Sequence, residues 1–202
     1  DCPESRGLGD VYKRQSEASV ECTACGIGRY GNASAARSSI MHCSACATGK
    51  YQAGSGATYC DACDAGQHTN ATASVSCRPC QAGKYSGASA AECTQCEAGK
   101  YQGTSSQQQC VGCSAGQYSG AGAAACTSCL AGFKSMAGAS ACTECTAGKF
   151  QGAAGGTECA VCPAGKFLEA GGGAGCAACP TGKYQRSGQS YCLESPAGMS
   201  VK

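Results

Sequence analysis

The apolar and polar positions of the chain repeat with a short, nearly fixed period. A CxxC pair recurs every 16 or 17 residues after a first step of 21, and a glycine follows three residues after the second cysteine of each pair. After the glycine come a polar residue, most often lysine, and then an aromatic residue, before a stretch rich in Gly, Ala and Ser. Such a period predicts a repeat architecture in which each unit packs on its neighbours.

Each unit is predicted to be a short β-hairpin. In the unit from Cys96 to Cys110, Gly99 supplies a turn with positive φ, and Lys100–Tyr101 begin a strand. Because neighbours on a strand point to opposite faces, the lysine faces water and the ring lies inward over a disulfide. A unit of about 16 residues is too small to fold alone, so we expect an elongated array with contacts mainly between adjacent units.

Two units depart from this pattern. His68 stands in the aromatic position of one unit, and we interpret it as a substitute for the stacking ring. In another unit the order is reversed to Phe133-Lys134, and a one-residue shift would turn each side chain to the opposite face. We expect a β-bulge there that returns the ring to the stack, since burying an unpaired ammonium costs more than a local kink.

The composition excludes an ordinary hydrophobic core. Of 202 residues, 22 are Cys and 31 are Gly, whereas Leu, Ile, Val and Phe together number 15. This favours a small disulfide-rich fold that is mostly coil and turn with little helix. The net charge of +2 gives no reason to expect a nucleic acid partner, and no apolar run of 18 residues predicts a membrane span.

The CxxC pair, the Gly-x-Tyr/Phe step and the closing cysteine, as in CEAGKYQGTSSQQQC from Cys96 to Cys110, resemble ephrin-receptor-like cysteine-rich repeats. They are also similar to the single-disulfide modules of tumour-necrosis-factor receptors and to growth-factor-receptor cysteine-rich domains. The resemblance covers residues 22–198. It implies an extracellular or cell-surface repeat region that serves as a stalk and as a protein or glycan recognition ectodomain, without catalytic residues or a cofactor.

The ends of the chain differ from the repeats, which we place at residues 16–198. Residues 1–15 share neither composition nor pattern with the rest, and Ser5–Gln15 can be back-translated into a sequence that resembles a transposon-type sequencing-library adapter. We therefore expect residues 1–15 to be a non-native, adapter-derived leader. The last unit is degenerate, with Ser195 in the position of a cysteine, and residues 199–202 are expected to be the end of a fragment.

The cysteines admit disulfide, zinc and redox interpretations. Two C-x2-C pairs at this spacing are close to a four-cysteine zinc site, so an intracellular array of zinc-binding modules is the alternative function. Against zinc, each pair would have to choose one of two equivalent neighbours, and the array ends on Cys192 alone. Thioredoxin-like chemistry needs a CxxC at the start of a helix, which glycine-rich units this short do not offer.

A disulfide series in which each unit closes on itself uses every cysteine after residue 15 except Cys22. Pairing within each CxxC, or first-to-first and second-to-second, would instead leave Cys192 alone. The series joins Cys25 to Cys43, Cys46 to Cys60, Cys63 to Cys77, Cys80 to Cys93, Cys96 to Cys110, Cys113 to Cys126, Cys129 to Cys142, Cys145 to Cys159, Cys162 to Cys176 and Cys179 to Cys192.

Few other residues carry candidate chemistry. Asn32 and Asn70 begin N-glycosylation triplets, which are used only if the protein enters the secretory pathway. The recurring lysines form either a solubilising face or a track for anionic glycans, and interspersed acids favour the former. With only His42 and His68 as histidines, the sequence has almost no material for a catalytic triad, and we predict no enzyme.

Overall fold

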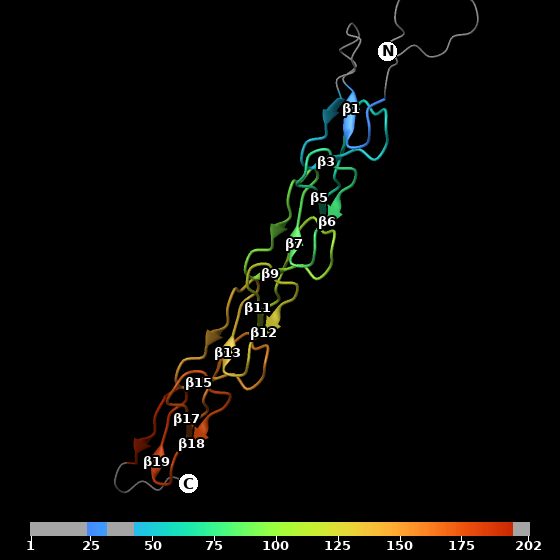
Figure 1. The fold of residues 1–202 in the computed structure, drawn as a ribbon. Coiled ribbons are helices and arrows are strands. Elements are labelled where there is room, and N and C mark those ends of the chain that lie inside the picture. The colour runs from blue at the N-terminus through green and yellow to red at the C-terminus, as the bar shows by residue number, and fades with distance from the viewer. Residues whose placement is uncertain (1–23, 32–42, 196–202) are drawn as a thin grey trace, which may run out of the picture. The chain divides into compact units, whose positions relative to one another are not determined.

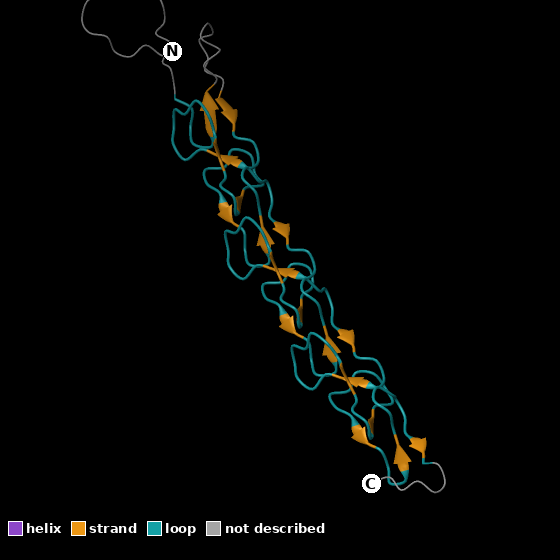
Figure 2. Cartoon of the chain, turned by 180° about the vertical axis from the view of Figure 1, so that it is seen from behind, coloured by secondary structure: helices purple, strands orange, loops and turns teal. Residues whose placement is uncertain are grey.

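The computed structural model describes residues 24–31 and 43–195. These residues form ten two-stranded antiparallel hairpins and contain no helix. Figure 2 shows how short the strands are beside the loops that connect them. The prediction of a small disulfide-rich array of hairpin modules, mostly coil and turn, is confirmed. The leader at residues 1–15, Cys22, Asn32 and residues 199–202 lie outside the described residues.

The hairpins pair consecutive strands along the chain, and nearly all strands are two residues long. In order they are β1 (Arg29–Gly31) with β2 (Cys43–Ala45), β3 (Lys50–Tyr51) with β4 (Asp61–Ala62), β5 (Gln67–His68) with β6 (Arg78–Pro79), β7 (Lys84–Tyr85) with β8 (Thr94–Gln95), β9 (Lys100–Tyr101) with β10 (Val111–Gly112), β11 (Gln117–Tyr118) with β12 (Thr127–Ser128), β13 (Phe133–Lys134) with β14 (Thr143–Glu144), β15 (Lys149–Phe150) with β16 (Ala160–Val161), β17 (Lys166–Phe167) with β18 (Ala177–Ala178), and β19 (Lys183–Tyr184) with β20 (Leu193–Glu194).

The chain divides into two compact units, Asp1–Cys80 with Ser86–Cys93 and Gln81–Tyr85 with Thr94–Lys202. The first unit contains β1 to β6, and the second contains β7 to β20. Within the second unit the hairpins follow one another in chain order, as Figure 1 shows from β7 to β19.

The module from Cys96 to Cys110 illustrates how the sequence produces each hairpin. Gly99 has φ +83°, and the Lys100 N–H donates to the Glu97 carbonyl at 3.0 Å, which closes the turn before β9. Tyr101 then pairs with Val111 in the short ladder. The glycine at this position has positive φ in all ten modules, which confirms the predicted turn conformation.

Adjacent modules satisfy one another's backbone groups, because a two-residue ladder leaves most of them unpaired. The Gly99 N–H donates to the Ser119 carbonyl at 2.8 Å, and the Gly122 N–H donates to the Cys96 carbonyl at 2.7 Å. Ser119 and Gly122 both belong to the following module, Cys113–Cys126. Hydrogen bonds to the next module therefore complete hairpins such as β9–β10, as the repeat pattern predicts.

Close packing also reaches the next module but one. A β-carbon placed on Gly99 would lie 2.0 Å from the carbonyl oxygen of Gly138, at the tip of the module that begins at Cys129. The same approach occurs between Gly116 and Gly155, at 2.1 Å. The expectation that contacts stay mainly between adjacent units is therefore too narrow. The repeat glycine also packs against a hairpin tip two modules further on.

The Phe133-Lys134 inversion produces no bulge, so that prediction is wrong. Phe133 pairs with Glu144 and Lys134 with Thr143, the same register as in the neighbouring hairpin β11–β12. The side chains at both positions are half-buried. Because the aromatic position of the repeat is never fully buried, a lysine there can cover apolar surface with its stem while its ammonium stays in water.

Candidate functional site

Ten disulfides run through the array, and each joins the second cysteine of one pair to the first cysteine of the next. Their Cα–Cα distances lie between 5.5 and 5.8 Å, in the usual range for disulfides. The bonds join Cys25 to Cys43, Cys46 to Cys60, Cys63 to Cys77, Cys80 to Cys93, Cys96 to Cys110, Cys113 to Cys126, Cys129 to Cys142, Cys145 to Cys159, Cys162 to Cys176 and Cys179 to Cys192.

The two cysteines of a disulfide differ in exposure in nine of the ten modules. The opening cysteine of these nine modules is at most 2% exposed, and together these cysteines make up the buried apolar core. The closing cysteine, such as Cys93 or Cys110, is only half-buried, and in the tenth module Cys179 and Cys192 are both half-buried. Sulfur therefore takes the place of the missing aliphatic core, and in nine of the bonds one cysteine lies nearer to solvent than the other.

The aromatic position lies beside the disulfide of the following module. Tyr85 lines a shallow hollow together with Gln109 and Cys110, the closing cysteine of the next hairpin. The aromatic rings at this position are half-buried rather than enclosed. Tyr85 thus lies near the disulfide of the neighbouring module.

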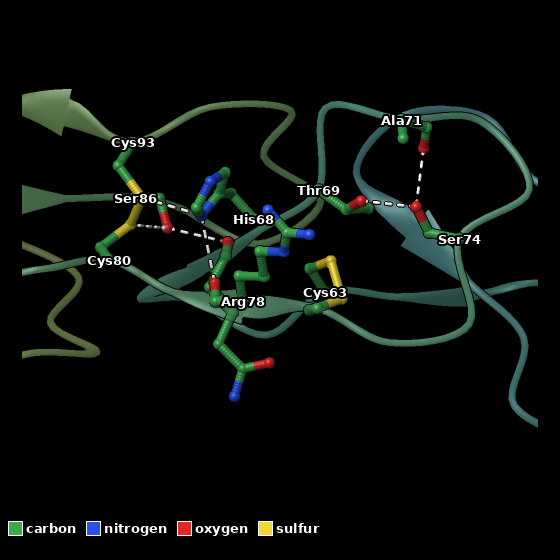
Figure 3. The surroundings of a disulfide bond; sticks show 11 residues. Cys63, His68, Thr69, Ala71, Ser74, Arg78, Cys80, Ser86 and Cys93 are labelled. Carbon is green, nitrogen blue, oxygen red and sulfur yellow. Dashed lines mark hydrogen bonds between the residues drawn. A yellow bond between two sulfur atoms is a disulfide. The ribbon is translucent and has the colours of Figure 1, made fainter.

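His68 occupies this aromatic position beside the disulfide Cys80–Cys93. Its Nδ1 lies 3.1 Å from the Cys93 Sγ and 3.1 Å from the Arg78 carbonyl oxygen (Figure 3). Among the described residues, His68, Cys80 and Cys93 form the one group of three candidate metal ligands, with their ligand atoms within 4.8 Å of one another. Because Cys80 and Cys93 are bonded to each other, they offer no thiolate to a metal in this state.

A buried polar position, which the repeat pattern did not predict, follows directly after the aromatic one. Gln102 is 8% exposed, its Nε2 donates to the Gln109 carbonyl at 2.8 Å, and its Oε1 accepts from the Thr104 N–H at 3.3 Å. The amide thus ties both arms of its own loop together. Gln52 is bonded in the same way, to the Tyr59 carbonyl and the Gly54 N–H.

A serine at the same position links two modules instead. The Ser119 Oγ donates to the Lys100 carbonyl of the preceding module at 2.9 Å, and the Ser135 Oγ donates to that of Gln117 at 2.9 Å. Both serines are buried. In the sequence, Gln, Ser or Thr fills this position in eight modules, and that regularity could have indicated its role.

The exposed lysines are partly neutralised by acids. The Lys100 ammonium lies 2.9 Å from a Glu97 carboxylate oxygen, and that hydrogen bond and the attraction between the charges lower the pKa of Glu97 and raise the pKa of Lys100. Lys183 lies 2.8 Å from Glu194. Two of the recurring lysines are therefore paired with acids, which reduces the positive charge along the lysine positions.

Asn70, the sequon residue within the described part of the chain, is exposed near the tip of its hairpin. The other residue of the triplet that matters for glycosylation, Thr72, is exposed as well. In the ranges that the structure describes, no helix has the length and apolar character needed to cross a membrane.

These features define a class, the tandem arrays of single-disulfide hairpins, in which short covalent loops replace a hydrophobic core. Residues 83–118 and 132–173 match the family described as tyrosine-protein kinase ephrin type A/B receptor-like. These two segments therefore carry ephrin-receptor-like cysteine-rich repeats, the family that the spacing of the cysteines resembles. No curated protein matches the chain.

Proposed function

We propose that this chain is an extracellular or cell-surface cysteine-rich repeat region that serves as a stalk and recognises a protein or glycan ligand, without catalysis. The observation that carries the proposal is the unbroken series of ten disulfides. Disulfides persist in oxidising compartments, and small secreted domains that lack a core depend on them. In this proposal the repeat region spans residues 16–198.

The match to a receptor-type family supports a binding role rather than a chemical one. The surface also supports it, because large apolar side chains such as Leu130 and Met136 are exposed to a binding partner. The acid-paired lysines favour a protein ligand over an anionic glycan, which would need several free cations in a row.

Expression of the chain with a secretion signal in an oxidising host tests the proposal. We expect secreted protein that contains no zinc and no reactive thiol among the twenty cysteines of the series. We also expect an N-linked glycan on Asn70 that is lost in Asn70→Gln, since the sequon lies on an exposed loop. Stoichiometric zinc bound by free thiols would instead support the intracellular zinc array.

Binding to immobilised heparin and to a library of secreted proteins then separates the two ligand classes. A protein ligand is expected to bind at physiological ionic strength with little dependence on salt. Glycan binding that weakens steeply as salt rises, and that fails when Lys50 and Lys149 are both replaced by Gln, would identify the lysine face as the recognition surface.

A further inference from the structure

The disulfide Cys80–Cys93 has a polar environment that sets it apart from the others. Among the described residues it is the one disulfide with a side-chain nitrogen or oxygen within hydrogen-bond distance of each sulfur. His68 Nδ1 lies 3.1 Å from the Cys93 Sγ, and Ser86 Oγ lies 3.3 Å from the Cys80 Sγ (Figure 3). Every other module has Tyr, Phe or Lys in the position of His68.

The hydrogen positions follow from the neighbouring carbonyls. A carbonyl oxygen only accepts, so the 3.1 Å contact with the Arg78 carbonyl places the hydrogen of the imidazole on Nδ1, where the Cys93 sulfur shares it. The Ser86 hydroxyl donates to the Gln67 carbonyl at 3.0 Å, which leaves a lone pair of its oxygen free to face the Cys80 sulfur. Cys93 thus faces a donor, and Cys80 faces an acceptor.

This arrangement matches the reduced pair better than the disulfide. A disulfide has no S–H to donate to Ser86, whereas a Cys80 thiol does. A Cys93 thiolate would accept a charge-assisted hydrogen bond from the His68 ring, and a cation beside a cysteine is the usual cause of a stabilised thiolate. Interactions that stabilise the reduced form of a pair raise its reduction potential.

We propose that Cys80–Cys93 is a thiol–disulfide exchange site, reduced in preference to the other disulfides of the array by dithiol reductants, with His68 as the group that stabilises the Cys93 thiolate. Cys80 is fully buried and Cys93 is half-buried, so an external thiol reaches Cys93 first.

The exchange is balanced with a dithiol as the co-reactant. One thiolate of the reductant attacks the Cys93 Sγ, the S–S bond breaks, and its electron pair goes to the Cys80 Sγ, which takes up one proton. The second thiol attacks the reductant's own sulfur in the mixed disulfide, and Cys93 leaves as a thiolate. The second proton goes to Nε2 of His68. The products are the reductant's disulfide, a Cys80 thiol and a thiolate–imidazolium pair.

The repeat offers a matched control for this site. Tyr101 bridges to Ala123 just as His68 bridges to Ala90. The following disulfides, Cys113–Cys126 and Cys80–Cys93, both have a sequence separation of 13. Ser119 repeats the hydrogen bond of Ser86 to the preceding strand. His68→Tyr therefore converts the site to the ordinary arrangement, and Tyr101→His builds the proposed arrangement elsewhere.

Equilibration of the oxidised chain with increasing ratios of reduced to oxidised dithiothreitol, followed by alkylation and peptide mass spectrometry, tests the proposal. We expect Cys80–Cys93 to be half-reduced at a ratio at least about tenfold lower than that for Cys113–Cys126, a difference of about 30 mV for a two-electron couple. His68→Tyr should remove this difference, and Tyr101→His should lower the ratio for Cys113–Cys126.

Reduction of all disulfides together, or an unchanged midpoint in His68→Tyr, would overturn the proposal. Tyr101→Leu, which removes the phenol ring without adding a donor to sulfur, separates thiolate stabilisation from a merely structural loosening of the module. Loosening predicts selective reduction of Cys113–Cys126 in both Tyr101→Leu and Tyr101→His, and this result would also overturn the proposal, whereas thiolate stabilisation predicts it in Tyr101→His alone. The experiment needs no ligand and no assumption about location, so its result is independent of the proposed function.

Discussion

Gly99 and Gly165 occupy the same position of the repeat and have nearly the same backbone conformation, with φ of +83° and +80°. Their surroundings differ. A β-carbon on Gly99 would lie 2.0 Å from the Gly138 carbonyl oxygen, two modules further on, whereas nothing among the described residues lies within 4 Å of one on Gly165. At Gly99 the repeat glycine therefore satisfies both the positive φ and the close approach of another module, whereas at Gly165 it satisfies the positive φ alone.

The comparison of Gly99 with Gly165 separates two physical reasons why glycine recurs at this position of the repeat. Positive φ is a local requirement of the turn, and every module carries it. The close approach of a tip is a requirement of the array, and it exists only where a described module lies two places further along. Modules such as Cys96–Cys110 thus have described modules on both sides, while Cys179–Cys192 is the last module that the structure describes.

The largest expected effect comes from alanine at the two glycines. Gly165→Ala should lower the free energy of unfolding by about 1 kcal/mol, because the left-handed conformation is strained for a residue with a β-carbon. Gly99→Ala adds a clash with a backbone oxygen that cannot rotate away, so its total should be about 2–4 kcal/mol. Native-state hydrogen exchange checks this at the Gly138 N–H, which donates to the Cys113 carbonyl at 2.8 Å and should exchange about 100-fold faster in Gly99→Ala.

The reporter for Gly165→Ala is the Gly188 N–H in the following module, which donates to the Cys162 carbonyl at 3.0 Å; its equivalent beside Gly99 is the Gly122 N–H, bonded to the Cys96 carbonyl at 2.7 Å. The Gly188 N–H should stay within about tenfold of its original exchange rate. If amide exchange were accelerated equally in both variants, the positive φ alone would explain the regular spacing of these glycines. The packing of Gly138 against Gly99 would then contribute nothing to stability.

A smaller effect is expected at the buried hydroxyl between adjacent modules. Ser119→Ala leaves the Lys100 carbonyl without its 2.9 Å hydrogen bond and should cost about 1–2 kcal/mol. Exchange of the Gly99 N–H, which is bonded to the Ser119 carbonyl, reports this loss. Ser114→Ala in the same module is the control, because that side chain is exposed and its removal should leave exchange unchanged.

The smallest effect concerns a hairpin tip. Ser106 has φ +60°, whereas Gly122 and Gly138 hold the same tip position in later modules. Ser106→Gly relieves left-handed strain but increases the entropy of the unfolded chain, so it should stabilise by less than about 1 kcal/mol. The neighbouring Ser105→Gly brings only the entropy term and should lower the thermal midpoint. If both variants lowered the midpoint, strain at Ser106 would be excluded.

Much of this fold could be predicted from the sequence because its determinants are local. The CxxC spacing, the turn glycine and the Lys-Tyr step each act within one hairpin, and the family match agrees with that pattern. The close packing of Gly138 against Gly99 could not be predicted. A glycine required for its positive φ cannot be told apart in the sequence from one required for close approach.

Other features escaped prediction for physical reasons of their own. Gln102 and Ser119 look like ordinary polar loop residues, and their burial follows only from the neighbouring module folding over them. No bulge forms at Phe133 because the aromatic position is only half-buried, so a lysine there keeps its ammonium in water, and the residue types alone do not show this degree of exposure. The environment of Cys93 depends on His68, a residue 25 positions away.

Mapping of disulfide-linked peptides tests whether the cysteines are paired in series. The chain is secreted from an oxidising host, blocked with an alkylating reagent without reduction, and cleaved between modules. We expect Cys113 to be linked to Cys126 and Cys179 to be linked to Cys192, with no alkylated cysteine among the twenty of the series. Links within a CxxC pair, such as Cys110 with Cys113, or an alkylated Cys192, would contradict it.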